Sequence, residues 1–227
     1  MDRRLMERCP EPELMDDAEQ ARAYAQADFS RAHQAVVALF QRRFGNVAGI
    51  ALDLGCGPGD VTIRFARAYP ELHLLGIDGS EAMLAEGRQA VAALGLAHQI
   101  TLERRFLPDP TLPAAAFDVV VSNSLLHHLS DPAALWRAVR HAARAGAPVL
   151  VVDLCRAESP EAARALTAEH AAGAPEVLAR DFYNSLLAAY TVAEVTQQLA
   201  AAGLGSLHAE TTDELHLAVW GHAPARA

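Results

Sequence analysis

Three glycines stand at every second position in the segment LDLGCGPGD, residues 52–60, directly after a short apolar run. The apolar residues predict the end of a buried strand, and a helix over residues 61–68 is expected to follow at once. Glycine has no Cβ, so it lets the chain turn sharply and brings the backbone close to a ligand. The start of the next helix offers unpaired N–H groups to polar or negatively charged ligand groups. The chemistry that this segment supports is binding rather than catalysis.

The spacing of Gly55, Gly57 and Gly59 discriminates between cofactors. A dinucleotide fingerprint has the pattern G-x-G-x-x-G, whereas Asp60 stands where its final small residue should be. We therefore expect a nucleoside-type cofactor rather than a pyrophosphate, with a purely structural glycine turn as the alternative. Asp53 precedes the first glycine by two residues, where its carboxylate can face an amino acid ammonium or, less directly, a sulfonium.

A second apolar strand is expected over residues 72–78 and ends in Asp78. In a doubly wound sheet, an acid about 20 residues after the glycine motif hydrogen-bonds the ribose hydroxyls. The alternative is that Asp78 only caps the next helix, over residues 81–93. Ser80 is the better N-cap for that helix, so we predict that Asp78 binds ribose.

Three segments of the chain resemble the class I S-adenosylmethionine-dependent methyltransferases. They are LDLGCGPGD at 52–60, GIDGSEAML at 76–84 and FDVVVSNSLLHHLSDP at 117–132. The likeness covers residues 49–154 and is weaker in the flanks. It implies S-adenosylmethionine as the cofactor and an α/β fold. That fold is a Rossmann-like, doubly wound sheet of seven mostly parallel strands with an antiparallel last strand.

The resemblance also implies how the cofactor is held. It assigns the methionine end to Asp53 and the glycine loop, and adenine packing to the neighbourhood of Met83. Basic and aromatic residues at 104–106 replace the acid that the family often places after the third strand. The adenine is therefore expected to lie against backbone N–H groups and Phe106 or Leu107. The predicted cofactor residues are Asp53, Gly55, Cys56, Gly57, Gly59, Asp78, Gly79, Met83, Phe106, Leu107 and Asn123.

The segment SNSLLHHLSDP follows the fourth expected strand and carries the candidate catalytic groups. Ligands of such sheets lie at the carboxyl ends of the strands, which places this segment beside the reacting methyl group. Asn123 binds the methionine end or the acceptor, or it satisfies loop backbone. Neighbours on a helix diverge by about 100°, so only one of His127 and His128 is expected to face the pocket. We predict His127 as the general base and His128 as a substrate-binding residue; the alternative is one packed and one solvated imidazole.

Further acceptor-binding candidates lie in the flanking segments. Tyr24 and Phe29 are expected to form an aromatic lid over the sulfonium or, alternatively, to pack the first helix onto the sheet. Arg156 follows the fifth strand and can hold a carboxylate through two parallel hydrogen bonds. Tyr183 and Asn184 are expected to form a polar edge of the acceptor site. A solvated surface position is the alternative for Arg156.

The chain is expected to form one domain. Residues 1–13 are predicted to be a flexible N-terminus, because charges and prolines leave little to bury. Residues 14–227 are predicted to form the methyltransferase domain. It has a helical cap over 14–45 and a helical insertion after the fifth strand, over 158–190, broken at 173–175.

Composition excludes several partners. A formal net charge of −9 and the absence of long basic clusters argue against nucleic acid, whose phosphates would be repelled. No apolar run approaches the roughly 20 residues that span a bilayer, and no signal peptide is evident. Three cysteines without ligand spacing indicate reduced thiols in the cytoplasm, and the scattered histidines predict no metal site.

The function expected from the sequence is therefore methyl transfer to a nitrogen or oxygen of a small molecule, with sulfur as a further acceptor atom. The enzyme is expected to be a monomer or homodimer. Two alternatives stay open. One is a non-catalytic protein that binds S-adenosylmethionine and serves a partner, and the other is a methyltransferase acting on protein or RNA.

Overall fold

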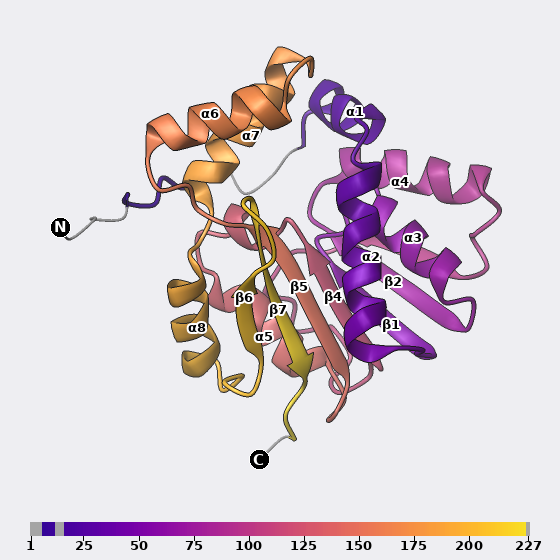
Figure 1. Cartoon of the computed structure of the whole chain (residues 1–227). Coiled ribbons are helices and arrows are strands. Elements are labelled where there is room, and N and C mark those ends of the chain that lie inside the picture. Colours follow the sequence, from indigo (N-terminus) through magenta and orange to yellow (C-terminus); the bar gives the residue numbers. More distant parts are fainter. Residues whose placement is uncertain (1–5, 12–15, 226–227) are drawn as a thin grey trace.

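The computed structural model describes residues 6–11 and 16–225, which fold into a seven-stranded sheet flanked by helices (Figure 1). The strands are β1 (Gly49–Leu54), β2 (Leu72–Asp78), β3 (Ile100–Arg104), β4 (Val119–Asn123), β5 (Pro148–Leu154), β6 (His208–Thr211) and β7 (His216–His222). The helices are α1 (Ala18–Gln26), α2 (Ser30–Phe44), α3 (Asp60–Ala68), α4 (Glu81–Ala93), α5 (Ala133–Ala142), α6 (Pro160–His170), α7 (Glu176–Ala188), α8 (Val192–Ala201) and the 3₁₀ turn η1 (Leu126–His128).

The strand order is β3-β2-β1-β4-β5-β7-β6. Strands β1 to β5 pair in parallel, and β7 runs antiparallel to both β5 and β6. The predicted fold class, with its antiparallel strand near the end of the chain, is confirmed. The chain moves outward from β1 to β3 and then returns to place β4 on the other side of β1. This reversal opens a crevice at the carboxyl ends of β1 and β4, where doubly wound sheets bind ligands.

Both faces of the sheet are buried, because alternate side chains of each strand enter different layers. Ala51 packs into a core with side chains of α2, α3 and α4. Leu52 and Leu54 pack into the opposite core, with side chains of α5 and α8. Phe40 of α2 and Trp136 of α5 are fully buried in these two cores. This packing fixes the strand ends that carry the functional residues.

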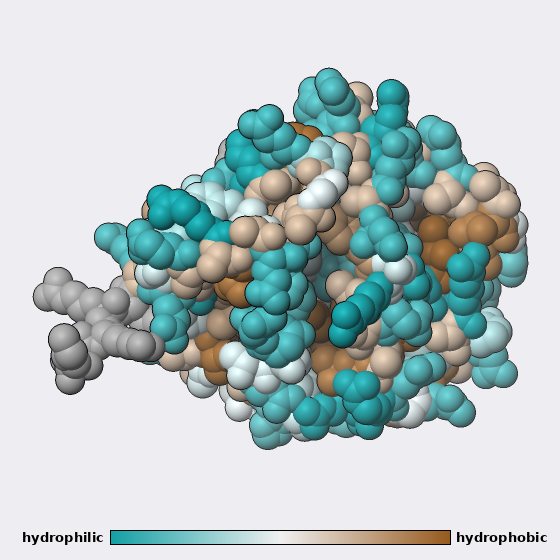
Figure 2. All heavy atoms as spheres, turned by 45° about the horizontal axis from the view of Figure 1, so that its top comes forward, coloured by the Kyte–Doolittle hydropathy of each residue, from teal (hydrophilic) through white to brown (hydrophobic). Residues whose placement is uncertain are grey.

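Helices α1, α6 and α7 lie at the end of the molecule toward which β1 to β5 point (Figure 1). Hydrophilic and hydrophobic residues are intermingled over this end (Figure 2). The break predicted at 173–175 is confirmed, since α6 ends at His170 and α7 begins at Glu176. Within the described residues, no helix has the length and apolar character needed to cross a membrane.

The N-terminal segment departs from the prediction of a flexible 1–13. Of these residues, the structure describes 6–11, and they lie against α7 and η1. The Arg8 guanidinium donates to the carbonyl oxygens of Ala188 at 2.5 Å and His127 at 2.7 Å, and its charge lies 4.2 Å from the Tyr190 ring centroid. The N–H of Cys9 donates to the Leu187 carbonyl at 3.0 Å. Residues 6–11 thus have defined contacts, because one arginine donates hydrogen bonds to carbonyl groups of two distant segments.

Candidate active site

The glycine loop turns directly after β1 and is held against β2. The N–H groups of Gly55 and Cys56 both donate to the Ile77 carbonyl, at 2.8 and 3.0 Å. Gly57 has a φ of +52°, and a Cβ at this position would have no atom within 4 Å. Gly57 also lines a cavity next to the glycine loop. The loop is therefore a cradle whose space a side chain would fill.

Asp78 at the end of β2 is bound to the glycine loop. Its carboxylate accepts from the Gly57 N–H at 2.9 Å and from the Ser80 N–H at 2.8 Å. Burial raises the pKa of Asp78, although these backbone donors act in the opposite direction. The hydroxyl of Ser80 accepts from the Met83 N–H at 3.1 Å, which confirms Ser80 as the cap of α4. Asp78 is thus oriented by neighbours on both sides and does not serve as the helix cap.

Asp53 lies in β1 beneath the loop and is only 1% exposed. The hydroxyl of Thr62 donates to its carboxylate at 2.5 Å. Burial raises the pKa of Asp53 to about 6, and the negative charge of Asp78 contributes to the rise. An ionised Asp53 is therefore costly without a nearby cation, which fits a site for a positively charged ligand group.

The glycine loop, Asp53 and Asp78 open into one cavity of about 150 Å³. Ten of the eleven predicted cofactor residues line it, and Gly59 does not. Gly59 begins α3, and a Cβ there would point toward Leu102 and Gly87. Its φ of +77° shows that the turn, rather than ligand contact, requires glycine at this position. The ten are Asp53, Gly55, Cys56, Gly57, Asp78, Gly79, Met83, Phe106, Leu107 and Asn123.

Tyr24 enters the same cavity from α1. Burial raises its pKa to about 12, and the surrounding carboxylates add to the rise, so the phenol stays neutral. Phe29 does not line the cavity. It stands behind the lining, with its ring centroid 4.8 Å from that of Tyr24 and 5.4 Å from that of His33. Its predicted place in the lid is thus corrected to a support for two lining residues.

A second acid of the loop, Asp60, lines the cavity together with His33. His33 Nδ1 lies 2.6 Å from the Asp60 carboxylate, and Arg64 Nε donates to the same oxygen at 2.8 Å. Burial opposes ionisation, but these two partners outweigh it and hold the pKa of Asp60 at about 2. From the sequence, Asp60 indicated only that a dinucleotide is excluded. Its position directly after the glycines was the available signal that it is a site residue.

The structure places His128 at the cavity, where the sequence predicted His127. His128 lines the cavity, whereas His127 is 2% exposed and lies outside the lining. His127 Nδ1 is 2.5 Å from Asp153 Oδ1, and Asp153 also accepts from the backbone N–H groups of Leu126 and Leu154. Burial lowers the pKa of His127, but the charges of Asp153 and Glu11 outweigh burial and the net shift is upward. The base predicted at His127 is therefore not at the cavity surface.

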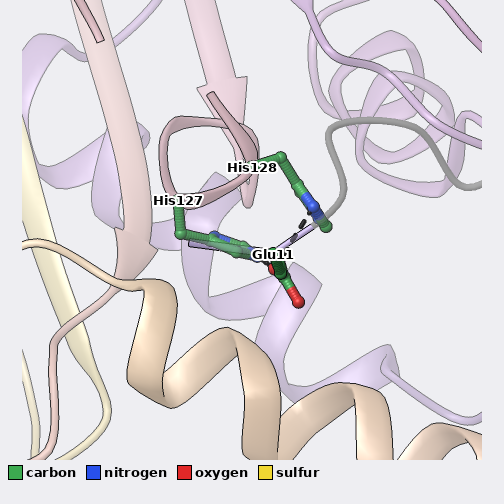
Figure 3. Close-up of side chains that lie close together, drawn as sticks. All are labelled: Glu11, His127 and His128. Atoms are coloured by element: carbon green, nitrogen blue, oxygen red, sulfur yellow. Dashed lines mark ion pairs between the residues drawn. The ribbon is translucent and has the colours of Figure 1, made fainter. Parts of the chain in front are cut away.

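Glu11 contacts both histidines, and no sequence prediction included it. Its carboxylate Oε1 lies 3.4 Å from His127 Nε2 and 3.2 Å from His128 Nδ1, and both rings point toward it (Figure 3). The Ser185 hydroxyl donates to the same carboxylate at 3.0 Å. Burial raises the pKa of Glu11. No local pattern could have revealed this contact, because the N-terminal segment reaches it only through the tertiary fold.

The remaining acceptor candidates lie away from the cavity lining. Arg156 is buried, and its guanidinium donates to Glu194 at 2.6 Å, so the prediction that it binds substrate is corrected to a structural ion pair. Tyr183 and Asn184 are in α7 but do not line the cavity, and Tyr183 packs in the small core between α6 and α7. The edge predicted for them is not part of this cavity.

The sheet order and the glycine loop with its two acids are those of the Rossmann-like methyltransferases. A family model described as a methyltransferase domain matches residues 52–149. The matched residues, less than half of the chain, thus correspond to a methyltransferase domain, and the fold of the chain is that of solved S-adenosylmethionine-dependent methyltransferases.

Individual relatives agree with this class. Trans-aconitate 2-methyltransferase of Methylobacterium radiotolerans is 35% identical over 88 residues, which are 38% of this chain and 30% of that protein. Phosphoethanolamine N-methyltransferase 1 of Arabidopsis thaliana is 31% identical over 105 residues, which are 46% of this chain and 21% of that protein. The crystal structure of a methyltransferase from Aquifex aeolicus has a TM-score of 0.66 at 18% identity and covers 91% of this chain and 98% of its own. The matched segments thus span less than a third of either curated relative, and the structural likeness shows the fold.

Proposed function

We propose that this protein transfers the methyl group of S-adenosylmethionine to a nucleophilic nitrogen or oxygen, or to a sulfur, of a small molecule. The observation that carries the proposal is that one cavity is lined both by the expected cofactor residues and by Tyr24, Asn123 and His128. The bound cofactor supplies an electrophilic methyl carbon and a thioether leaving group. The protein contributes alignment, exclusion of water and, where the acceptor carries a proton, its removal.

The residues present fit the cofactor. The space above Gly57 admits backbone approach, and Asp78 is oriented to accept from ribose hydroxyls while it remains bound to the loop. Asp53 supplies a buried carboxylate for the ammonium of the methionine end. Phe106 and Leu107 line the cavity, where they are proposed to pack against the adenine. The neutral phenol of Tyr24 is available for the sulfonium or the acceptor.

The charge of the cavity favours an amine acceptor over a polycarboxylate. Asp53, Asp60 and Asp78 all line it. Arg105 also lines the cavity, but its guanidinium already donates to the carboxylates of Glu103 and Asp109, at 2.7 Å each. A ligand with several negative charges would therefore meet repulsion without an unpaired guanidinium to offset it. The net charge of −9 argues against a nucleic acid acceptor.

Methyl transfer is tested with S-adenosylmethionine labelled on its methyl group and matched acceptor pools. One pool holds primary and secondary amines, a second holds phenols and alcohols, and a third holds polycarboxylates. We expect labelled product and demethylated cofactor from the amine pool first. Tight cofactor binding with no transfer to any pool would instead support a non-catalytic binding protein, and transfer only to polycarboxylates would contradict the charge argument.

A further inference from the structure

We propose that Glu11, His127 and His128 form a three-ligand site for a divalent transition metal ion of the Zn²⁺ type. Each residue can offer one ligand atom, and the three atoms lie within 4.8 Å of one another. The site lies beside the cofactor residues and is separate from them. The inference concerns metal binding, so it does not depend on whether the chain transfers methyl groups.

The distances fit a shared metal better than direct hydrogen bonds. Glu11 Oε1 is 3.4 Å from His127 Nε2 and 3.2 Å from His128 Nδ1. Charge-assisted N–H···O bonds are usually about 2.7–2.9 Å long. In a tetrahedral site with metal–ligand distances of about 2.0–2.2 Å, neighbouring ligand atoms stand roughly 3.3–3.5 Å apart. The two measured separations are close to the edges of such a tetrahedron.

The surroundings of the three residues resemble a supporting shell. A metal-bound histidine commonly donates its other ring N–H to a carboxylate, which fixes the tautomer and the ring orientation. His127 Nδ1 does this to Asp153 at 2.5 Å, and Asp153 is itself fixed by two backbone N–H groups. Since an ionised carboxylate only accepts, Nδ1 carries a proton in this contact, and in the neutral imidazole that binds a metal the lone pair is therefore on Nε2, on the Glu11 side. Ser185 donates to the Glu11 carboxylate and orients it in the same way.

Burial separates this cluster from an ordinary surface ion pair. The side chains of Glu11, His127 and His128 are 9%, 3% and 17% exposed. A second cluster of the same residue types, Glu169, His170 and Glu214, is exposed throughout. In that cluster, His170 Nε2 lies 3.0 Å from Glu214 Oε1, as expected of a direct contact at the surface. The exposed cluster provides a matched control within the same chain.

Three protein ligands leave one position of a tetrahedral ion open, which is the arrangement of catalytic rather than structural zinc. His128 lines the cavity, so a metal held by it stands at the wall of the acceptor site. A water molecule or an oxygen or nitrogen of the acceptor can complete the coordination. The sequence predicted no metal site, because the adjacent histidines lack the i, i+4 spacing of a helical ligand pair. Glu11, the third ligand proposed here, is distant from them in the sequence.

The test uses the full chain, stripped with a chelator and then titrated with Zn²⁺ against a chromophoric competitor. We expect one tightly bound Zn²⁺ per chain and, with Co²⁺ as the probe, the visible absorption of a four-coordinate ion. Glu11→Gln and His128→Ala should each weaken Zn²⁺ binding about 100-fold or more, and Asp153→Asn about 10–100-fold. His170→Ala should leave the affinity of the tight site unchanged.

Calorimetry with the demethylated cofactor separates this inference from the proposed function. Glu11→Gln should lose Zn²⁺ while it retains cofactor affinity and the circular dichroism of the parent chain. Two results would overturn the metal site. One is a folded parent chain that holds no more Zn²⁺ than Glu11→Gln, which would leave His127 as a cation between two carboxylates. The other is an equal loss of Zn²⁺ on His170→Ala, which would move binding to the exposed cluster.

Discussion

The backbone N–H of Gly57 donates to the carboxylate of Asp78 at 2.9 Å, which joins the glycine loop after β1 to the end of β2. The two segments are separated by α3 in the sequence, yet they form one unit. The same carboxylate accepts from Ser80, so Asp78 connects the loop to the start of α4 as well. A ligand that bonds to Asp78 therefore meets a loop whose position is already set.

Substitution of Gly57 tests the cradle. Gly57→Ala should weaken cofactor binding at least about tenfold, because its Cβ enters the cavity. The positive φ should also cost about 1–2 kcal/mol of stability. Gly95→Ala is the matched control, since Gly95 has a φ of +69° and equally open space but lies outside the cavity lining. We expect similar losses of melting temperature in both variants and a loss of calorimetric affinity in Gly57→Ala alone; equal affinities would contradict the assignment.

Asp78→Asn tests the ribose contact with little change of shape. We expect the free energy of cofactor binding to fall by roughly 1.5–3 kcal/mol, because charge-assisted hydrogen bonds to a carboxylate are lost. Titration calorimetry with the demethylated cofactor measures this loss. Adenosine should lose a similar increment, since it keeps the ribose, whereas methionine should bind both proteins alike. A loss seen equally with methionine would show that the loop itself had moved.

The raised pKa of Asp53 predicts how stability and cofactor affinity depend on pH. The folded pKa of about 6 lies above the usual aspartate value of 3.8, so the protonated form is favoured in the folded state. This contribution is fully present below about pH 4 and is lost as pH rises through 6. Asp53→Asn should therefore raise the free energy of unfolding of the free protein by about 2–3 kcal/mol near pH 8, relative to its effect near pH 4.

Cofactor binding should show the opposite trend. The ammonium of the ligand favours ionised Asp53, so affinity should rise between about pH 5 and pH 7 in the parent chain. Asp53→Asn should remove most of this rise and bind more weakly at pH 7. Calorimetry in buffers with different ionisation enthalpies detects the proton released on binding. No proton release in this range would contradict the role of Asp53 as the partner of the ammonium.

Alanine substitutions of His127 and His128 should have different effects, one on stability and the other on turnover. His127→Ala leaves the carboxylate of Asp153 buried without its imidazole partner, and removing one partner of a buried pair costs about 3–5 kcal/mol. His128→Ala should change the melting temperature much less, yet lower turnover about 100-fold, because His128 is the histidine at the cavity. Denaturant titration and single-turnover rates measure the two effects. Comparable turnover losses in the two variants, with equal stabilities, would contradict this separation of their effects.

The cofactor half of the site was predictable because each of its residues is placed by a local pattern. An apolar strand followed by glycines, or by an acid, fixes a position at the carboxyl edge of the sheet whatever the rest of the chain does. Asp53, Gly57 and Asp78 follow this rule, as does the cap at Ser80. The helix and strand boundaries around them depend on the same local signals.

The acceptor half was not predictable in the same way. The rule that neighbours on a helix diverge did not foresee that His127 and His128 would both turn to one carboxylate, with ring centroids 4.2 Å apart. Glu11 reaches them from a segment with no apolar pattern of its own. Arg156 was predicted to bind a carboxylate of the ligand, but its partner is the carboxylate of Glu194, which belongs to the capping box of α8. These contacts depend on distant segments, which a one-dimensional pattern does not encode.

The docking of residues 6–11 has a consequence for the order in which the molecule is assembled. Arg8 and its acceptor at Ala188 are separated by 180 positions, so the start of the chain is synthesised long before its binding surface exists. Docking of residues 6–11 closes a very long loop, and the entropic cost of closing it is offset by only a few contacts. We therefore expect this docking to occur late in folding. Hydrogen exchange should therefore release the Cys9 amide before that of Ala51 in β1. A chain caught in that intermediate state would already hold the glycine loop against Asp78, while Glu11 had not yet reached the two histidines.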